Sequence, residues 1–503
     1  MGLGRGEQRP DRVRRPRAPR ALHLKEGTEQ KTGGLVMANE IPRSVANAIG
    51  LLPEDRETVR ALLDLYYRKL ARNKLRDRYY EMHHKPRDLG ISVPPNLRGL
   101  EEVIGWPAKA VDALANRSQF DGFVSCDGSV TEQLAGIVSL NGMKRRYRKT
   151  VKSELKHSCA FVAVTDGAEE GEDPRPLVSM YPATSASALW SDRLNRIRAG
   201  MVVVDRDRRA GRRAEPTWVN VYTDTAVIAI VRDGGNGWEA TYYEHSMGRC
   251  LMEPLCHEAT ADRPFGTSRI SRAVMNLTDN AMRASVRTEV ASEFFTSPQK
   301  FLLGADKSAL DGMSKWDAYI GQIFAISRDK NGEIPSFGQL SQGSMQPHSD
   351  YMRMLAARFS GETDVPISEL GIVSDNPSSA EAIYAAKEPL VIDAQNLNAD
   401  NGEALTNVAL MALAVENGTD FETERRRGLA VQAKFRNPAM PSIVSQSDAM
   451  VKMISALPWL AESDVALEEF GFTDDQIQRL RSDRTRANGR QVVTAALGLP
   501  PDD

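Results

Sequence analysis

The sequence predicts an α+β fold, and three observations support this prediction. Residues 54–82 repeat apolar side chains every three to four positions, as an amphipathic helix does. From about 119 to 260 the chain is rich in β-branched and aromatic residues, which favour strands. The run from Ser268 to Phe295 contains neither proline nor glycine and keeps helical apolar spacing, which predicts one long helix.

The N-terminal part is predicted to be helical. The helix over 54–82 would place its apolar residues on one face: Val59, Leu62, Leu63, Tyr66 and Leu70. Pro53 suits the first turn of this helix, and Pro86 ends the run. A second helix is predicted over 107–117.

Strands are predicted for the segments CAFVAVTDG (159–167), MVVVDRD (201–207), TWVNVYTDTAVIAIVRDGG (217–235) and WEATYYEH (238–245). The sequence DGGNG, residues 233–237, predicts a hairpin turn between the last two segments.

The long helix over 268–295 has two faces of different chemistry. One narrows to small residues in its second half, which lets helices approach closely: Ala281, Ala284, Thr288 and Ala291. Another face is predicted to carry arginines: Arg269, Arg272, Arg283 and Arg287. We expect these arginines to pair with carboxylates of adjacent helices rather than to hold DNA, although either role is open.

The chain beyond this helix is predicted to contain both strands and helices. Strands are predicted at 322–329 and 335–342, followed by a shorter helix at 349–359 and a loop at 360–377. Ser378-Ser379-Ala380-Glu381 predicts a capped helix, which Pro389 would kink, and 431–438 resembles a strand. Short helices follow to the end.

Charge and cysteine content restrict the function. The formal net charge is −2, so there is no global electrostatic case for nucleic-acid binding. Residues 1–36 hold nine Lys/Arg and four Asp/Glu, hence +5, which leaves −7 for the remainder. This basic segment is either an arm for nucleic acid or a disordered leader translated from a start upstream of Met37, and we favour the leader.

No catalytic chemistry is predicted. The chain contains no GxxxxGK[ST], GxSxG or HExxH pattern, so we predict no catalytic, cofactor-binding or metal-binding residue, no cofactor and no enzymatic activity. Cys250, Cys256 and His257 lie close in sequence, but a structural zinc site needs a second ligand pair, so free thiols are favoured. No apolar run reaches the length of a membrane span.

The order of these parts, together with three phrases, carries a family resemblance. The phrases are DRYYEMHHKPRDLGISVPPNLRGLEEVIGWPAKAVDALANRSQFDGF (77–123), FGTSRISRAVMNLTDNAMRASVRTEVASEFFTSPQKFLLG (265–304) and DVPISELGIVSDNPSSAEAI (364–383). Over roughly 40–500 the chain resembles portal proteins of long-tailed phages and prophages of actinobacteria. Residues 1–36 fall outside the family pattern.

The resemblance implies a portal fold with a division into parts. These are a leader (1–36), a mixed α/β wing (37–266), a first stem helix (267–297), a small α/β clip (298–347), a second stem helix with tunnel loop (348–377), a wing helix and return strand (378–445) and a helical crown (446–503). The small residues of the stem would pack neighbouring subunits. The tunnel loop would contain Gly361, Glu362, Asp364, Glu369, Gly371 and Asp375. Its acids have no balancing Lys or Arg within the loop, so it should not grip phosphate, and its glycines would let it move.

The resemblance also implies partners and a location. The chain would form a homo-oligomeric ring, a dodecamer, at the capsid vertex of a virion, after assembly in the host cytoplasm. Double-stranded DNA would pass through the ring without sequence-specific contacts, which suits a conduit. The terminase large subunit, a head–tail adaptor, the major capsid protein and a scaffold protein would be further partners, with no membrane involved. The alternative is another virion protein, such as a head–tail connector or minor capsid protein.

Overall fold

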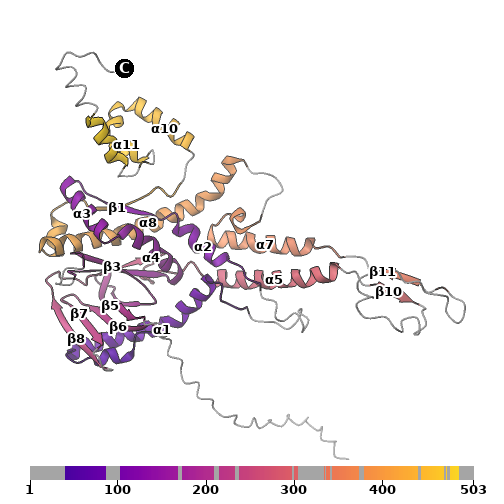
Figure 1. The fold of residues 1–503 in the computed structure, drawn as a ribbon, viewed down its shortest axis with the longest axis horizontal. Helices are drawn as coiled ribbons and strands as arrows, with labels where there is room; N and C mark the ends of the chain where they lie inside the picture. The colour runs from indigo at the N-terminus through magenta and orange to yellow at the C-terminus, as the bar shows by residue number, and fades with distance from the viewer. Residues whose placement is uncertain are drawn as a thin grey trace, which may run out of the picture.

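The structure is a computed structural model, and it describes residues 40–86, 102–167, 173–208, 214–232, 237–296, 300–303, 334, 336–339, 343–372, 379–439, 443–469, 472 and 476–486. The predicted leader and most of the predicted clip lie outside these residues. Helices and strands both build the described body, so the predicted α+β class is confirmed (Figure 1).

A five-stranded antiparallel meander forms one layer of the body. Its strands are β4 (Ala186–Ser191), β5 (Arg196–Asp207), β6 (Glu215–Tyr222), β7 (Ala226–Arg232) and β8 (Trp238–Glu244). Helix α1 (Pro53–Tyr80) and the short η1 (Arg43–Asn47) pack against one face of it. All five apolar residues predicted for the inner face of α1 are buried, so this helix and its orientation are confirmed.

The strands divide their side chains between two hydrophobic cores, because successive residues of a strand point to opposite faces. In β5, Met201 belongs to the core under α1, whereas Val202 belongs to the second core. A smaller antiparallel sheet borders that second core, in the order β3 (Leu177–Pro182), β2 (Cys159–Thr165) and β9 (Met252–Cys256). Strands occupy all four predicted segments between 159 and 245, but the segment 217–235 forms two strands, β6 and β7, and β3 and β4 were not predicted. Strand β7 pairs with β8 across the predicted turn.

Two helices lie where the sequence predicted only strands, so that prediction was wrong for 128–157. These are α3 (Gly128–Leu140), whose N-cap Asp127 accepts a hydrogen bond from the Ser129 amide, and α4 (Met143–His157). In α4, Tyr147, Val151 and Leu155 recur every four residues and are fully buried. Lysines and arginines between them give α4 one apolar face, which packs over β2 and β3.

Helix α8 (Ala380–Asn417) crosses the body, packs against β2 and β9 of the small sheet and is hydrogen-bonded to α4 (Figure 1). It is capped by Ser379, whose side chain accepts a hydrogen bond from the Ala382 amide, and it contains Pro389, as predicted. Its Asn401 Nδ2 donates at 3.0 Å both to Tyr147 Oη and to Glu154 Oε2 of α4. The Glu154 carboxyl is fully buried, and no described residue bonds its Oε1.

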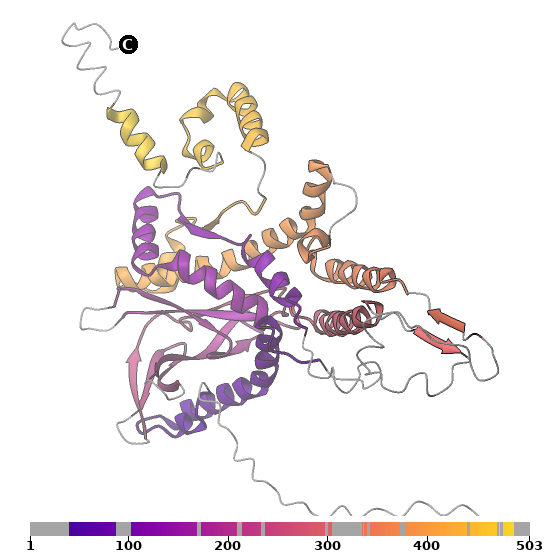
Figure 2. The same cartoon turned by 45° about the vertical axis from the view of Figure 1, so that its right-hand side comes forward.

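The C-terminal part begins beside the body and then leaves it (Figures 1 and 2). After α9 (Phe421–Arg426), the predicted return strand is β12 (Gln432–Phe435), which pairs antiparallel with β1 (Phe120–Val124). The predicted terminal helices are present as α10 (Ile443–Ala456), η5 (Pro458–Glu462), α11 (Asp464–Glu469) and a helix at 476–486.

Candidate functional site: the projecting helix pair

Two helices project from the body side by side and run in opposite chain directions (Figures 1 and 2). Helix α5 (Arg272–Thr296) leads away from the body and α7 (Gln346–Thr363) returns to it, in contact with α5. At the outer end, β10 (Lys300–Leu303) pairs antiparallel with β11 (Ser336–Gln339). The strand predicted at 335–342 is therefore present in shortened form, and the one predicted at 322–329 lies outside the described residues.

Helix α5 begins four residues later than the sequence predicted, at Arg272 rather than Ser268. Ser268 and Arg269 bond to the body, and Ser271 caps the helix by accepting a hydrogen bond from the Val274 amide. The Arg269 amide donates to the Leu155 carbonyl at 2.9 Å, and Ser268 Oγ donates to the Lys156 carbonyl at 2.5 Å. These bonds anchor the chain to the end of α4 immediately before α5 departs.

The small residues predicted to pack neighbouring subunits divide into two groups. Ala281 and Ala284 are buried within the single chain, 0% and 4% exposed, because α5 packs there against its own neighbours in the body and α7. Their methyl groups are therefore unavailable to a second subunit in this conformation. Thr288 and Ala291 lie further out and remain partly exposed. Thr288 Oγ1 donates to the Ala284 carbonyl of its own helix.

The predicted arginine face also divides. Arg272 and Arg287 are exposed, and Arg283 is half-buried with Nη2 donating to Asn280 Oδ1 at 2.6 Å. Among the described residues, these three arginines have no carboxylate within ion-pair distance. Arg269 lies outside the helix and is only 7% exposed, so its assignment to the arginine face of that helix was wrong, although it does pair with a carboxylate of another helix, Asp393 of α8.

The Arg269 side chain bonds to three helices at the base of the helix pair. Its Nε donates to the Ala110 carbonyl of α2 (Trp106–Ala115) at 2.9 Å, and its Nη1 pairs with Asp393 of α8 at 2.6 Å. Its Nη2 donates to the carbonyl of Thr363, the last residue of α7. A planar guanidinium offers five donors in fixed directions, which suits one side chain bonding to several elements at once.

The predicted tunnel loop is shorter than expected, because α7 extends through Thr363 and includes Gly361 and Glu362. Glu362 Oε1 accepts a hydrogen bond from Ser271 Oγ at 2.9 Å. Asp364 ends the helix in the left-handed region at φ 52°, and Gly371 has φ 85°. Asp375 lies outside the described residues.

Glu369 does not match the expectation of unbalanced acids. It lies in η4 (Ile367–Leu370) and pairs with Lys109 at 2.8 Å and Arg117 at 3.8 Å. Burial opposes its ionisation, but the hydrogen bond from Lys109 and the charges of Lys109 and Arg117 outweigh burial and lower its pKa. The balancing cations come from α2 and the residues after it, so a count of charges within the loop could not find them.

The four cysteines are free thiols that differ in burial. Cys159, Cys250 and Cys256 are buried free thiols, Cys126 is an exposed one, and burial raises the pKa of Cys159 to about 12. Within the described ranges, no group of three or more His, Cys, Asp or Glu side chains is arranged to hold a metal ion. A search of the same residues finds no helix both long and apolar enough to cross a membrane.

Comparison with known proteins extends these observations. The chain is 24% identical over 414 residues to the portal proteins of Mycobacterium phages D29 and L5, covering 80% of this chain and 83% of theirs. No protein-family model matches it.

Solved structures give a weaker match. A chain in the neck of an empty gene transfer agent particle has a TM-score of 0.42 and 12% identity, covering 72% of this chain and 89% of that one. The neck of the native particle gives a TM-score of 0.39 at 12% identity, with the same coverage. The resemblance inferred from the order of elements is thus confirmed by the curated relatives: along most of its length, this chain is similar to bacteriophage portal proteins.

Proposed function

We propose that this chain is a phage portal protein, the subunit of a homo-oligomeric ring, expected to be a dodecamer, at the capsid vertex. The ring would conduct double-stranded DNA during genome packaging and ejection. It would dock the terminase large subunit and, later, a head–tail adaptor, and it would contact the major capsid and scaffold proteins. The observation that carries the proposal is the similarity to two phage portal proteins over four-fifths of the chain.

The arrangement of elements supports a division of labour within such a subunit. The body formed by α1, the two sheets and α8 would be the wing, and α5 with α7 the two stem helices. The hairpin of β10 and β11 would belong to the clip, at the far end of the stem (Figure 1). Residues 446–503 would form the crown, and residues 364–377 would form the tunnel loop.

The stem has side chains suited to assembly and to weak contact with DNA. Thr288 and Ala291 are small and partly exposed, so a neighbouring helix can approach them closely. Arg272 and Arg287 are exposed and available to a carboxylate of a neighbouring subunit or to phosphate. A near-neutral chain suits a conduit, because each neutralised phosphate adds salt-dependent affinity that would hold DNA in place.

The role would be structural, without catalysis, and the location would be the virion, with assembly in the host cytoplasm. The sequence contains none of the searched catalytic motifs, which is consistent with a structural role. Duplex DNA would bind weakly and without sequence preference, with affinity that falls as salt rises.

Negative-stain electron microscopy of the purified chain tests the proposal. We expect rings with a central hole, and in virions the same protein at the single tail-bearing vertex by immunogold labelling. A chain that stays monomeric at every concentration and is absent from that vertex would refute the proposal. A position spread over the whole capsid would instead indicate a minor capsid protein.

A further inference from the structure

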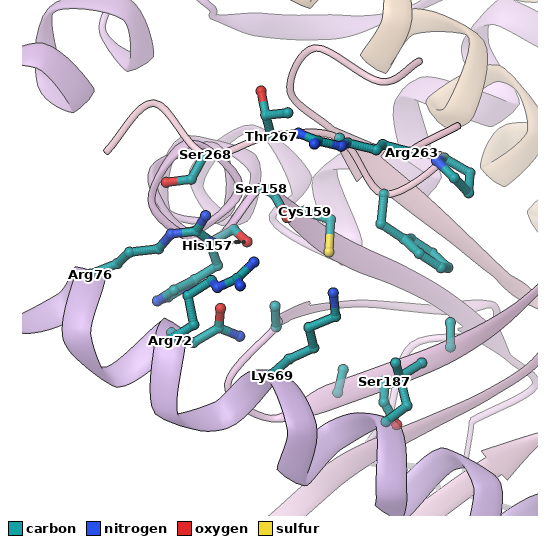
Figure 3. A pocket seen from close by; sticks show the side chains of 18 of the residues that line it. Lys69, Arg72, Arg76, His157, Ser158, Cys159, Ser187, Arg263, Thr267 and Ser268 are labelled. Carbon is teal, nitrogen blue, oxygen red and sulfur yellow. Dashed lines mark hydrogen bonds between the residues drawn. The ribbon is translucent and has the colours of Figure 1, made fainter. Parts of the chain in front are cut away.

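A basic pocket opens between α1, the start of β2 and the residues that lead into α5 (Figure 3). Its volume is about 550 Å³. Five cationic side chains line it, and Asp262 is the one carboxylate among its lining residues. The cations are Lys69, Arg72 and Arg76 of α1, with Arg263 and Arg272 from the opposite side.

The three cations of α1 share one helix face because they are spaced by three and four residues. Figure 3 shows Lys69 directed toward Cys159, with Arg72 and Arg76 beside it on the same helix. Within the described part of the chain, none of the three has a carboxylate at ion-pair distance. Arg76 Nη1 donates to the His157 carbonyl at 3.1 Å, while its Nε is buried without a partner among those residues.

The charged forms of two of these cations, Lys69 and Arg76, are destabilised. Burial and the charges of Arg72 and Arg68 lower the pKa of Lys69. Burial and the charge of Arg72 lower the pKa of Arg76 to about 10. The nearby Cys159 thiol provides no compensating charge, because burial raises its pKa to about 12. An anion in the pocket would relieve this repulsion.

The rest of the lining mixes polar and apolar side chains, and part of it is rigid. Phe161, Pro264 and Phe265 contribute to it. The backbone of the loop is fixed by bonds from the Gly266 amide to the Arg263 carbonyl and from the Thr267 amide to the His257 carbonyl, both 2.8 Å. Gly266 has φ 64°, and a Cβ there would lie 2.1 Å from the His257 oxygen, so only glycine permits this path. The pocket is therefore a preformed cavity that combines cations on two sides with an apolar patch at Pro264 and Phe265.

We propose that this pocket binds an acidic side chain, flanked by an apolar one, from a second copy of the chain. This inference rests on the proposed ring. Residues 37–503 carry a formal charge of −7, so subunits offer an excess of carboxylates to a neighbour's basic pocket. Duplex DNA matches it less well, because its phosphates lie on a convex, evenly charged surface without apolar groups to cover the partly exposed Phe265.

Calorimetric titration with inorganic phosphate at fixed ionic strength tests the anion chemistry. The pocket variant Lys69→Ala/Arg72→Ala should bind phosphate at least tenfold more weakly than the wild type. The matched control Arg60→Ala/Arg68→Ala removes two cations of the same helix that do not line the pocket, and it should bind like the wild type. Both positions of each pair are exposed, so all variants should fold. Equal phosphate binding by all three proteins would overturn the anion site.

Sedimentation velocity tests the occupant. Lys69→Glu/Arg72→Glu should weaken self-association at least tenfold, and Arg60→Glu/Arg68→Glu should leave it close to wild type. A 30-base-pair duplex serves as the competing ligand. If the pocket variant loses duplex binding but assembles normally, the pocket serves DNA and the proposed occupant is wrong. If the wild type never self-associates, the ring and the second copy fail together, while phosphate titration still decides the anion chemistry independently.

Discussion

Replacement of Arg269 by methionine should detach the helix pair from the body. The guanidinium bonds to the Ala110 carbonyl, the Thr363 carbonyl and the Asp393 carboxylate, and the residue is only 7% exposed. Methionine keeps much of the apolar volume and removes every donor. Three acceptors on three different helices then lose their shared partner.

The expected cost follows from what is left behind. Removal of one partner from a largely buried ion pair costs about 3–5 kcal/mol, because the remaining charge is uncompensated. Asp393 is 23% exposed at its side chain, so water would partly solvate it and the lower end of that range applies to the pair. The two orphaned carbonyls add about 1 kcal/mol each. We therefore expect a loss of about 5 kcal/mol, or roughly 10 °C in Tm for a cooperative unit near 250 residues.

Differential scanning calorimetry of Arg269→Met measures this shift, and hydrogen exchange localises it. Amides of α5 and α7 should lose protection first, because their attachment is what the substitution removes. Arg287→Met is the matched control, since Arg287 is exposed on α5 and has no carboxylate partner in the described part of the chain. A Tm shift below about 2 °C for Arg269→Met, equal to that of the control, would refute the anchoring role.

Three further predictions concern single side chains. Burial raises the pKa of Glu154 from 4.5 to about 8, so its folded form holds a proton that the unfolded form releases. The free energy of unfolding should therefore fall as pH rises from about 4.5 to 8, by up to roughly 5 kcal/mol. Thermal melts at stepped pH should show a flatter fall for Glu154→Gln. An unchanged pH profile in this variant would contradict the prediction. Gly361 lies inside α7 with open space around it, so Gly361→Ala should stabilise the fold by about 0.5–1 kcal/mol, and a loss of stability would show that the helix needs glycine there. Ala284→Leu should lower the free energy of unfolding by about 1–3 kcal/mol, because it overpacks a site buried within the chain. Ala291→Leu should leave Tm unchanged and reduce ring formation in negative stain. Equal Tm losses in the two variants would disprove this division of the stem.

Local sequence signals were sufficient to predict elements whose structure depends mainly on their own residues. The α1 helix, its five inward residues, the four predicted strand segments between 159 and 245 and the capped α8 helix all follow from apolar period and end signals. The helices α3 and α4 also carried a cap at Asp127 and a four-residue period at Tyr147, Val151 and Leu155. They were missed because the strand-rich residues on their C-terminal side dominated the interpretation of the whole region.

The candidate sites needed contacts between residues far apart in the chain. The three cations of the basic pocket could be recognised on one face of α1, but the wall opposite them comes from residues about 190 positions later. The sequence near Glu369 contains no balancing cation, but the fold places Lys109 beside it. Ala284 is small enough to contact a neighbouring subunit, but its own chain buries it.

Arg269 shows the same limit most clearly. Its spacing fits the arginine face of α5, yet hydrogen bonds at its base keep it out of the helix and turn it into the body. The period of apolar residues and the capping signals depend on neighbouring residues, so they can be recognised in a sequence. Which charge meets which partner depends on how whole helices pack, and that is settled only when the chain has folded.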